Sequence, residues 1–251
     1  MRPVDVHQSL HAQGEVFQLK YLAQQADAIL DGIDDLIAAT ERVAPVRTSQ
    51  PYALVREAAG APTNEEGRWE RAIWSEWNAS RPEDFLPGVC SKVVSYQIML
   101  RDTNTDRKWG EVDLLGRSPD GAPVVIELKG PSSNEPPLRG IVEGVAYAIA
   151  IRKAWAPCFG RQWCDRLQIA TEQSDGVCST IFAAPADYWE RVTGQQGPAW
   201  RVPKAAWEAI LRLMQAFAER QLPVSLVRLH AADPETPRGI SASLVDPASL
   251  V

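Results

Sequence analysis

The sequence is poor in the residues that build zinc sites, disulfide frameworks and membrane spans. It has 251 residues but only three histidines and four cysteines, and no two cysteines have CxxC spacing. We therefore expect no zinc site, and cysteines that are reduced and partly buried. No apolar run approaches the roughly 20 residues that span a bilayer, and no basic start precedes an apolar segment at the N-terminus. These absences predict a soluble, cytoplasmic chain with no membrane partner.

The chain also lacks an excess of positive charge. It has 26 Lys and Arg against 32 Asp and Glu, a formal net charge of -6. This argues against a surface that is basic all over, so any nucleic acid must be held by a local basic groove. Divalent ions bound to carboxylates reverse the local sign, so the acidic balance still allows metal-dependent chemistry on a nucleic acid. With 45% hydrophobic residues, the chain can bury a sizeable core.

Apolar residues near the N-terminus recur at three- and four-residue steps. They predict a helix from about Glu15 to Arg42, which Gly32 can interrupt. Its apolar stripe is expected to dock on the core or to pair with a partner, either another protein or a second copy of the chain. Residues 1–64 are thus predicted to form a helical extension and connector, ahead of a core at 65–232 and a turn-rich tail at 233–251.

Helical and strand-like patterns alternate in the predicted core. Trp69, Ile73 and Trp77 share one face of a helix predicted over Glu65–Trp77. The elements that follow are predicted as strands Lys92–Arg101, Gly110–Gly116 and Pro123–Leu128, helix Leu138–Trp155, strand Val177–Ala184, helices Ala186–Val192 and Pro203–Gln221, and strand Val224–Leu229. The order helix, strand, strand, strand, helix, strand predicts an α/β fold with a three-layer core.

Three charged residues stand out within these strands. Glu127 and Lys129 are two apart, so alternation sends both side chains to one face of a strand. The turn sequence RSPDGA joins that strand to the preceding one as a hairpin, which can bring Asp113 next to Glu127. Two carboxylates form a hard oxygen site suited to Mg²⁺ or Mn²⁺. Phosphodiester hydrolysis needs such a metal to activate water, and a nearby ammonium can orient that water or screen charge on the phosphate.

A hydrophobic strand with Asp113, a hairpin, and a second strand ending in Glu127-Leu128-Lys129 resemble the PD-(D/E)XK superfamily. The resemblance spans roughly Glu65–Ala184, and Val112 stands where the superfamily's name has Pro. It implies a restriction-endonuclease-like core of order αβββαβ and a metal-dependent nuclease acting on DNA, with RNA left open. It further implies that Asp113, Glu127 and the backbone carbonyl of Leu128 are metal ligands, and that Lys129 lies beside the attacking water.

The resemblance also suggests supporting residues. The family's core helix often contributes a glutamate; here Glu70 is the first candidate, with Glu66 and Glu76 as alternatives. In the branch that resembles helicase-associated exonuclease domains, Gln-x-x-x-Tyr follows the Glu-x-Lys. Here Glu143 and Tyr147 have that spacing, although Glu replaces Gln, and a structural role for both is the competing interpretation.

Basic and aromatic residues could supply the contacts to nucleic acid. The candidates for a groove that binds the backbone are Lys108, Arg117, Arg139, Arg152 and Lys153. A residue of this kind, taken singly, is more often an ordinary solvated charge. Trp109 is a candidate for base stacking, with packing as its alternative.

Two functional hypotheses follow. The first is a deoxyribonuclease that depends on Mg²⁺ or Mn²⁺. The second is a non-catalytic module that keeps the fold and binds nucleic acid or a protein, with the long N-terminal helix as its contact element. For Asp113, Glu127 and Lys129 the simplest competing interpretation is a cross-strand salt bridge on a solvated sheet face.

Overall fold

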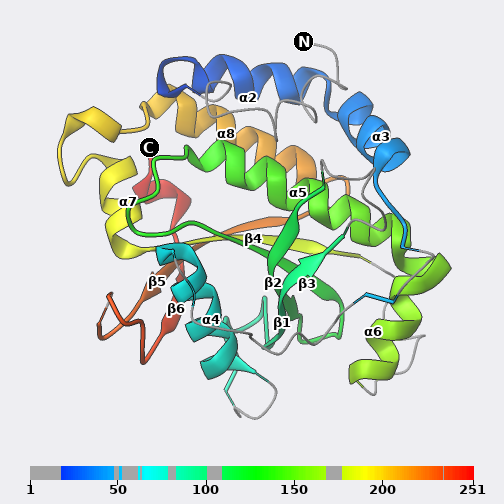
Figure 1. Cartoon of the computed structure of the whole chain (residues 1–251). Coiled ribbons are helices and arrows are strands. Elements are labelled where there is room, and N and C mark those ends of the chain that lie inside the picture. The colour runs from blue at the N-terminus through cyan, green and yellow to red at the C-terminus, as the bar shows by residue number, and fades with distance from the viewer. Residues whose placement is uncertain are drawn as a thin grey trace.

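The computed structural model describes residues 18–47, 51–52, 62, 64–78, 83–100, 109–167, 177–233 and 235–251. Within these ranges the chain forms an α/β fold around one six-stranded mixed sheet (Figure 1). Among these residues, no helix combines the length and apolar character needed to cross a membrane.

The sheet has the strand order β1-β2-β3-β4-β5-β6. The strands are β1 (Lys92–Met99), β2 (Glu111–Arg117), β3 (Pro123–Leu128), β4 (Ser179–Pro185), β5 (Val224–His230) and β6 (Ser241–Leu244). The first three form an antiparallel meander, β4 and β5 run parallel to β3, and β6 runs antiparallel to β5 at the edge. Strand β3 therefore lies inside the sheet, and all six of its residues are buried.

Helices cover both faces of the sheet. They are α2 (Leu22–Asp31), α3 (Ile33–Val43), α4 (Glu65–Trp77), α5 (Pro137–Ala154), α6 (Gly160–Leu167), α7 (Ala186–Thr193) and α8 (Lys204–Ala218). Short helical turns add η1 (Leu19–Tyr21), the π-helical η3 (Trp155–Phe159), η5 (Pro198–Trp200) and η6 (Pro247–Ser249). Helices α5 and α8 lie over one face, with α2 packed outside α8, and α4 packs on the opposite face (Figure 1).

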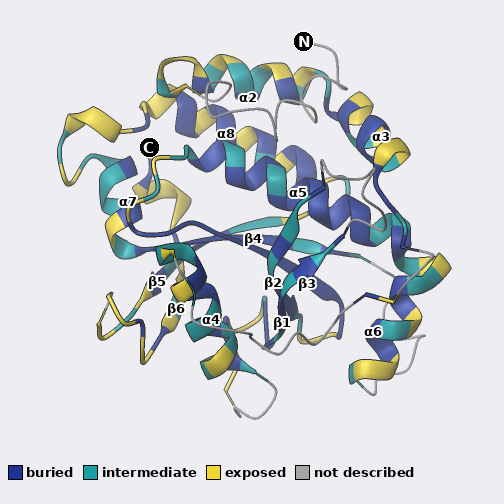
Figure 2. Ribbon diagram, viewed as in Figure 1, coloured by how far each residue is buried: buried dark blue, intermediate teal, exposed yellow. Residues whose placement is uncertain are grey.

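Each face of the sheet has its own apolar core, because successive residues of a strand point to opposite sides. On β3, Val125 joins the core beneath α5, whereas Ile126 and Leu128 join the core against α4. Helix α4 contributes the predicted stripe of Trp69, Ile73 and Trp77, all buried. The dark blue ribbons of Figure 2 follow these two layers. Glu127 consequently occupies a strand that is enclosed from both sides.

The α/β class and the predicted order of elements are confirmed. Helix Glu65–Trp77 and strand Pro123–Leu128 have the predicted bounds, and the N-terminal helix breaks at Gly32 into α2 and α3. Its expected start at Glu15, like the end of the first strand at Arg101, lies outside the described residues. The apolar stripe of α2 and α3 is buried in the chain's own core, where α2 packs on α8. That stripe is therefore already covered by this chain.

The segment predicted as a turn-rich tail contains a strand. Residues Ser241–Leu244 pair with β5 as β6, a strand of four mostly exposed residues. Contacts with α4 hold its start: the carboxylate of Glu76 accepts hydrogen bonds from the N–H groups of Gly239 and Ile240, at 2.7 and 2.8 Å. The indole N–H of Trp77 donates to the carbonyl of Ile240 at 2.9 Å. Tertiary contacts, absent from any local pattern, order this segment.

Candidate metal and active site

Asp113 lies where strands β2 and β3 stop pairing. Their antiparallel register ends with Leu114 opposite Ile126, and Asp113 is the next residue of β2. Its Oδ2 accepts a hydrogen bond from the backbone N–H of Leu128 at 2.8 Å. A side-chain acceptor thus satisfies an N–H at the end of β3 that the strand ladder no longer pairs. The sequence predicted Asp113 beside Glu127; the structure bonds it to the next residue of β3.

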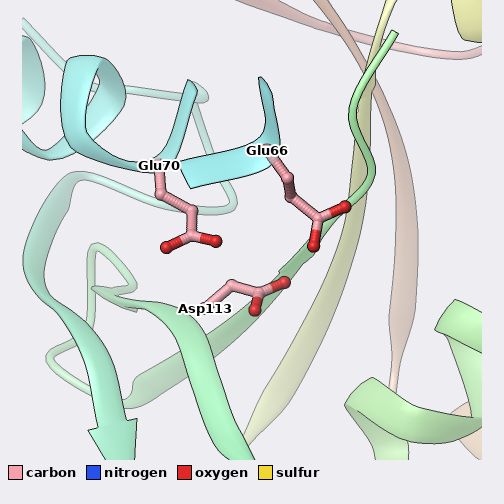
Figure 3. Close-up of side chains that lie close together, drawn as sticks. All are labelled: Glu66, Glu70 and Asp113. Carbon is pink, nitrogen blue, oxygen red and sulfur yellow. The ribbon is translucent and has the colours of Figure 1, made fainter. Parts of the chain in front are cut away.

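Helix α4 brings two glutamates to Asp113. Glu66 and Glu70 are four residues apart and share one face of the helix. Asn64 is the N-cap of the helix, and its side chain accepts a hydrogen bond from the N–H of Gly67 at 2.8 Å, which fixes this end. One carboxylate oxygen from each of Glu66, Glu70 and Asp113 lies within 4.8 Å of the others (Figure 3). We call these three residues the carboxylate cluster.

The loop after β3 is hydrogen-bonded to this end of α4. The backbone N–H of Gly130 donates to Glu66 Oε2 at 3.2 Å. The backbone N–H of Ser132 donates to Glu65 Oε2 at 3.2 Å, and its hydroxyl donates to the same oxygen. These bonds hold Glu66 in place and tie the end of β3 to α4.

Glu127 and Lys129 point to the same face of β3, as predicted. Lys129 Nζ lies 2.8 Å from Glu127 Oε1, and both side chains are buried. They face α5, which approaches closely at two glycines. A Cβ on Gly140 would lie 3.4 Å from Lys129 Cε, and one on Gly144 would lie 3.3 Å from Glu127 Cβ. Because both groups are buried, the predicted alternative of a salt bridge on a solvated face does not describe this pair.

The second oxygen of Glu127 has no hydrogen-bond partner among the described residues. Glu127 Oε2 is buried and unpaired, and an unpaired buried acceptor is costly. Lys129 Nζ instead lies 3.3 Å from a second carboxylate, Glu135, which in turn pairs with Arg139 at 2.9 Å. Glu127 does not belong to the carboxylate cluster, although the sequence predicted it as a metal ligand together with the carbonyl of Leu128, the last residue of β3.

Burial and mutual repulsion disfavour the charged forms of these glutamates. Burial, followed by the charge of Glu66, raises the pKa of Glu70 to about 7, against a hydrogen bond from Gln97. Burial raises the pKa of Glu127 to about 8, with the charge of Glu143 adding to the effect. The site therefore holds more negative charge than its protein surroundings stabilise.

The same surroundings favour the protonated forms of both Asp113 and Lys129. Burial, and then the charge of Glu127, raises the pKa of Asp113 well above its usual value. Burial opposes the charge of Lys129, but Glu127, Asp113 and Glu66 outweigh it and hold its pKa well above the usual value. Lys129 is thus a cation surrounded by an excess of carboxylates. Asp113 lies close enough to Glu127 and Lys129 for the charge of each to shift its pKa.

Gln97 supports the cluster and was not singled out by any sequence pattern. Its amide Nε2 donates to Glu70 Oε2 at 3.0 Å. It lies within β1 but has a φ of 51°, in the left-handed region that non-glycine residues seldom adopt. Such backbone strain is concentrated at functional sites. A glutamine in a strand gives no local signal of this conformation, which explains why the sequence did not reveal it.

The Glu143–Tyr147 pair of α5 borders the site. The hydroxyl of Tyr147 donates to Glu143 Oε1 at 3.0 Å, and the charge of Glu143 contributes to the raised pKa values of Glu127 and Glu66. The Tyr147 ring packs near that of Trp109, at 6.4 Å between centroids. Trp109 is 4% exposed, so the structure favours its packing alternative over base stacking.

Most of the predicted groove cations are not gathered at the site. Arg152 lies 2.6 Å from Glu41, and Lys153 donates to the carbonyl of Ala44 at 2.6 Å, so both tie α5 to the N-terminal helices. Arg117 ends β2 at the opposite end from the cluster, next to the turn into β3. Only Arg139, through Glu135, lies near Lys129 among these described cations.

Two further candidates are not placed at the site. Lys108 lies outside the described residues. Glu76, an alternative to Glu70, is engaged with Gly239 and Ile240 at the other end of α4.

The carboxylate cluster fits Mg²⁺ or Mn²⁺. These ions prefer hard oxygen ligands and commonly bind through a few carboxylates while keeping several waters. Glu66 and Asp113 are partly exposed, which leaves room for water or a substrate oxygen, and the unpaired Glu127 Oε2 offers a further acceptor nearby. No family model, no curated protein and no solved structure matches this chain. The geometry of the side chains therefore carries the functional proposal.

Proposed function

We propose that this chain is a metal-dependent nuclease that hydrolyses phosphodiester bonds of DNA, built on a restriction-endonuclease-like core. The observation that carries the proposal is the set of three carboxylate oxygens within 4.8 Å of one another, close to a buried lysine. The chain order α4-β1-β2-β3-α5-β4 supports the same family, since it is the order that the resemblance implies. DNA as the substrate rests on the resemblance alone.

Each residue has a distinct part in this proposal. Glu66, Glu70 and Asp113 would hold the ion. A bound Mg²⁺ or Mn²⁺ supplies Lewis acidity and lowers the pKa of a bound water. Lys129 remains protonated, and its ammonium can donate a hydrogen bond to the water or to a phosphate oxygen. Glu127 holds Lys129 Nζ at 2.8 Å and so sets where that donor lies.

The test compares cleavage by the wild-type chain and by isosteric variants. Plasmid, linear and single-stranded DNA, and RNA, would be incubated with Mg²⁺ or Mn²⁺ over a range of concentrations. Asp113→Asn keeps an acceptor for the N–H of Leu128, and Glu70→Gln keeps one for Gln97, so both variants should fold. We expect each to lose at least roughly 100-fold in rate, as removal of metal-binding groups commonly does.

The matched control is Glu208→Gln on the exposed face of α8, which removes one negative charge away from the cluster. Its rate should equal that of the wild type. DNA cleavage that is the same in all variants would indicate a contaminant and would contradict the proposal, as would the absence of cleavage of any substrate with either metal.

A non-catalytic binding module remains the second candidate. The observation that favours a protein ligand for such a module is that Arg152 and Lys153 are engaged within the chain, in a protein of net charge -6. Absence of both cleavage and binding of nucleic acid would replace the first proposal by this one.

A further inference from the structure

A pocket of about 750 Å³ opens beside the carboxylate cluster. Its walls come from the start of α4, the loop after β3, α7 with the turn that follows it, and residues 235–236. The start of α4 and α7 lie on the same side of the molecule (Figure 1). The volume lies in the range of pockets that bind small ligands, roughly 300–1,000 Å³.

The pocket and the cluster share a wall. Glu65 lines the pocket and Glu66 belongs to the cluster, so their Cα atoms are only about 3.8 Å apart. Ser132 also lines the pocket, and it lies three residues after Lys129 in the loop that binds Glu65. The pocket therefore lies next to the carboxylate cluster, at the start of α4.

Two arginines give the pocket its chemistry. Arg68 is exposed, and among the described residues no carboxylate pairs with it. Arg191 is held in place: its Nη2 donates to the carbonyl of Ser133 at 2.8 Å, and its guanidinium lies 5.9 Å from the centre of the Tyr188 ring. A free guanidinium beside a fixed one is suited to phosphate oxygens, which arginine binds through paired N–H groups.

The pocket also contains acidic side chains, and these restrict the ligand. Glu65 already accepts hydrogen bonds from Ser132, and Asp187 lies in the first turn of α7, where the helix dipole offsets its charge. Glu235 is exposed on the far wall. This mixture of charges disfavours a long track of backbone phosphates and favours one phosphate at the arginines.

We infer that this pocket binds the phosphodiester next to the one that is cleaved, with Arg68 as its main contact. The inference rests on the proposed nuclease function, because it takes the carboxylate cluster as the place of cleavage. It assigns to the substrate a second anchoring point that none of the basic residues singled out from the sequence supplies.

The first experiment measures binding without cleavage. Arg68→Ala would be made in the Asp113→Asn background, and the dissociation constant for a fluorescent single-stranded oligonucleotide would be measured by anisotropy at several salt concentrations. We expect affinity to fall about tenfold, as for the loss of one charge-assisted hydrogen bond. The slope of log affinity against log salt should become shallower by about 0.7, the value for one phosphate of a single strand.

The second experiment locates the contact. Oligonucleotides with a single neutral methylphosphonate at successive positions would be cleaved by wild type and by Arg68→Ala. One position next to the cleaved bond should slow the wild type about tenfold and leave Arg68→Ala unaffected. Arg68→Lys should recover part of the binding, because it keeps the charge and loses the paired donors.

The control is Arg166→Ala, which removes an exposed arginine from α6. It should leave binding and the methylphosphonate pattern as in the wild type. Cleavage that depends on Asp113, together with a salt slope and a methylphosphonate pattern unchanged by Arg68→Ala, would overturn the inference and leave the nuclease proposal standing. A change in salt slope in a chain that never cleaves would reject the nuclease and support the phosphate contact.

Discussion

Neutralising Glu70 should stabilise the metal-free protein, and the structure indicates by how much. Glu70 is 5% exposed, and its pKa is raised from 4.5 to about 7, chiefly by burial. Between these two values the folded chain keeps a proton that the unfolded chain releases. The contribution of Glu70 to stability is therefore greatest below about pH 4.5 and falls as the pH rises to about 7.

The difference in pKa sets an upper limit on the effect. It corresponds to at most about 3 kcal/mol at about pH 8, and Glu70→Gln removes this cost. For a chain of this length, each kcal/mol moves Tm by roughly 2–4 °C, so Tm should rise by roughly 6–12 °C at most. Near pH 4, where the carboxyl is protonated in both states, the variant and the wild type should melt together.

Added metal should make the wild type more stable than Glu70→Gln. Binding of an ion only to the folded state stabilises it by about 2.7 kcal/mol when the ion is at 100 times its dissociation constant. The wild type should gain this with Mg²⁺ or Mn²⁺, whereas Glu70→Gln should gain much less. The assay is thermal unfolding followed by circular dichroism, with Tm of the wild type and the variant measured at about pH 4 and about pH 8, with and without metal. A variant that is less stable than wild type at high pH without metal would refute the reasoning, and Glu208→Gln serves as the control.

Other predictions concern packing and strain. Gly140→Ala should lower the unfolding free energy by about 1–3 kcal/mol, because its Cβ would lie 2.4 Å from a carbon of the buried Phe182 ring. In Gly32→Ala the added Cβ meets only a carbonyl oxygen at 3.7 Å, so the unfolding free energy should change by no more than about 0.5 kcal/mol. Similar losses of unfolding free energy for Gly140→Ala and Gly32→Ala in urea would contradict the close approach of α5 to Phe182. Gln97→Gly relieves a left-handed backbone that costs about 1–2 kcal/mol, but it loses the hydrogen bond to Glu70 and makes the unfolded chain more flexible. Stability should therefore change little while Mn²⁺ affinity falls. Unaltered Mn²⁺ affinity, measured by calorimetry, would show that the amide does not position Glu70.

Short-range patterns predicted the elements that carry the site. The four-residue spacing of Trp69, Ile73 and Trp77 yields the bounds of α4, because one face of a helix recurs at that step. The two-residue spacing of Glu127 and Lys129 places both on one face of β3, where they form an ion pair. Both predictions depend only on the geometry of a single element.

The partners of Asp113 could be named only as candidates. The sequence made Glu70 the first candidate and left Glu66 and Glu76 as alternatives, since all three lie on α4. Packing of α4 against the sheet brings the first two to the cluster and turns Glu76 toward the segment before β6.

Local geometry repeats at a fixed step along the chain, so the amino-acid order alone was enough to reveal most helices, most strands and the Glu-x-Lys pair. The meeting of α4 with β2, the left-handed backbone of Gln97 and the pairing of β6 depend on contacts between residues far apart in the chain. These contacts are decided by how whole elements bury their apolar faces, which no short stretch of sequence encodes.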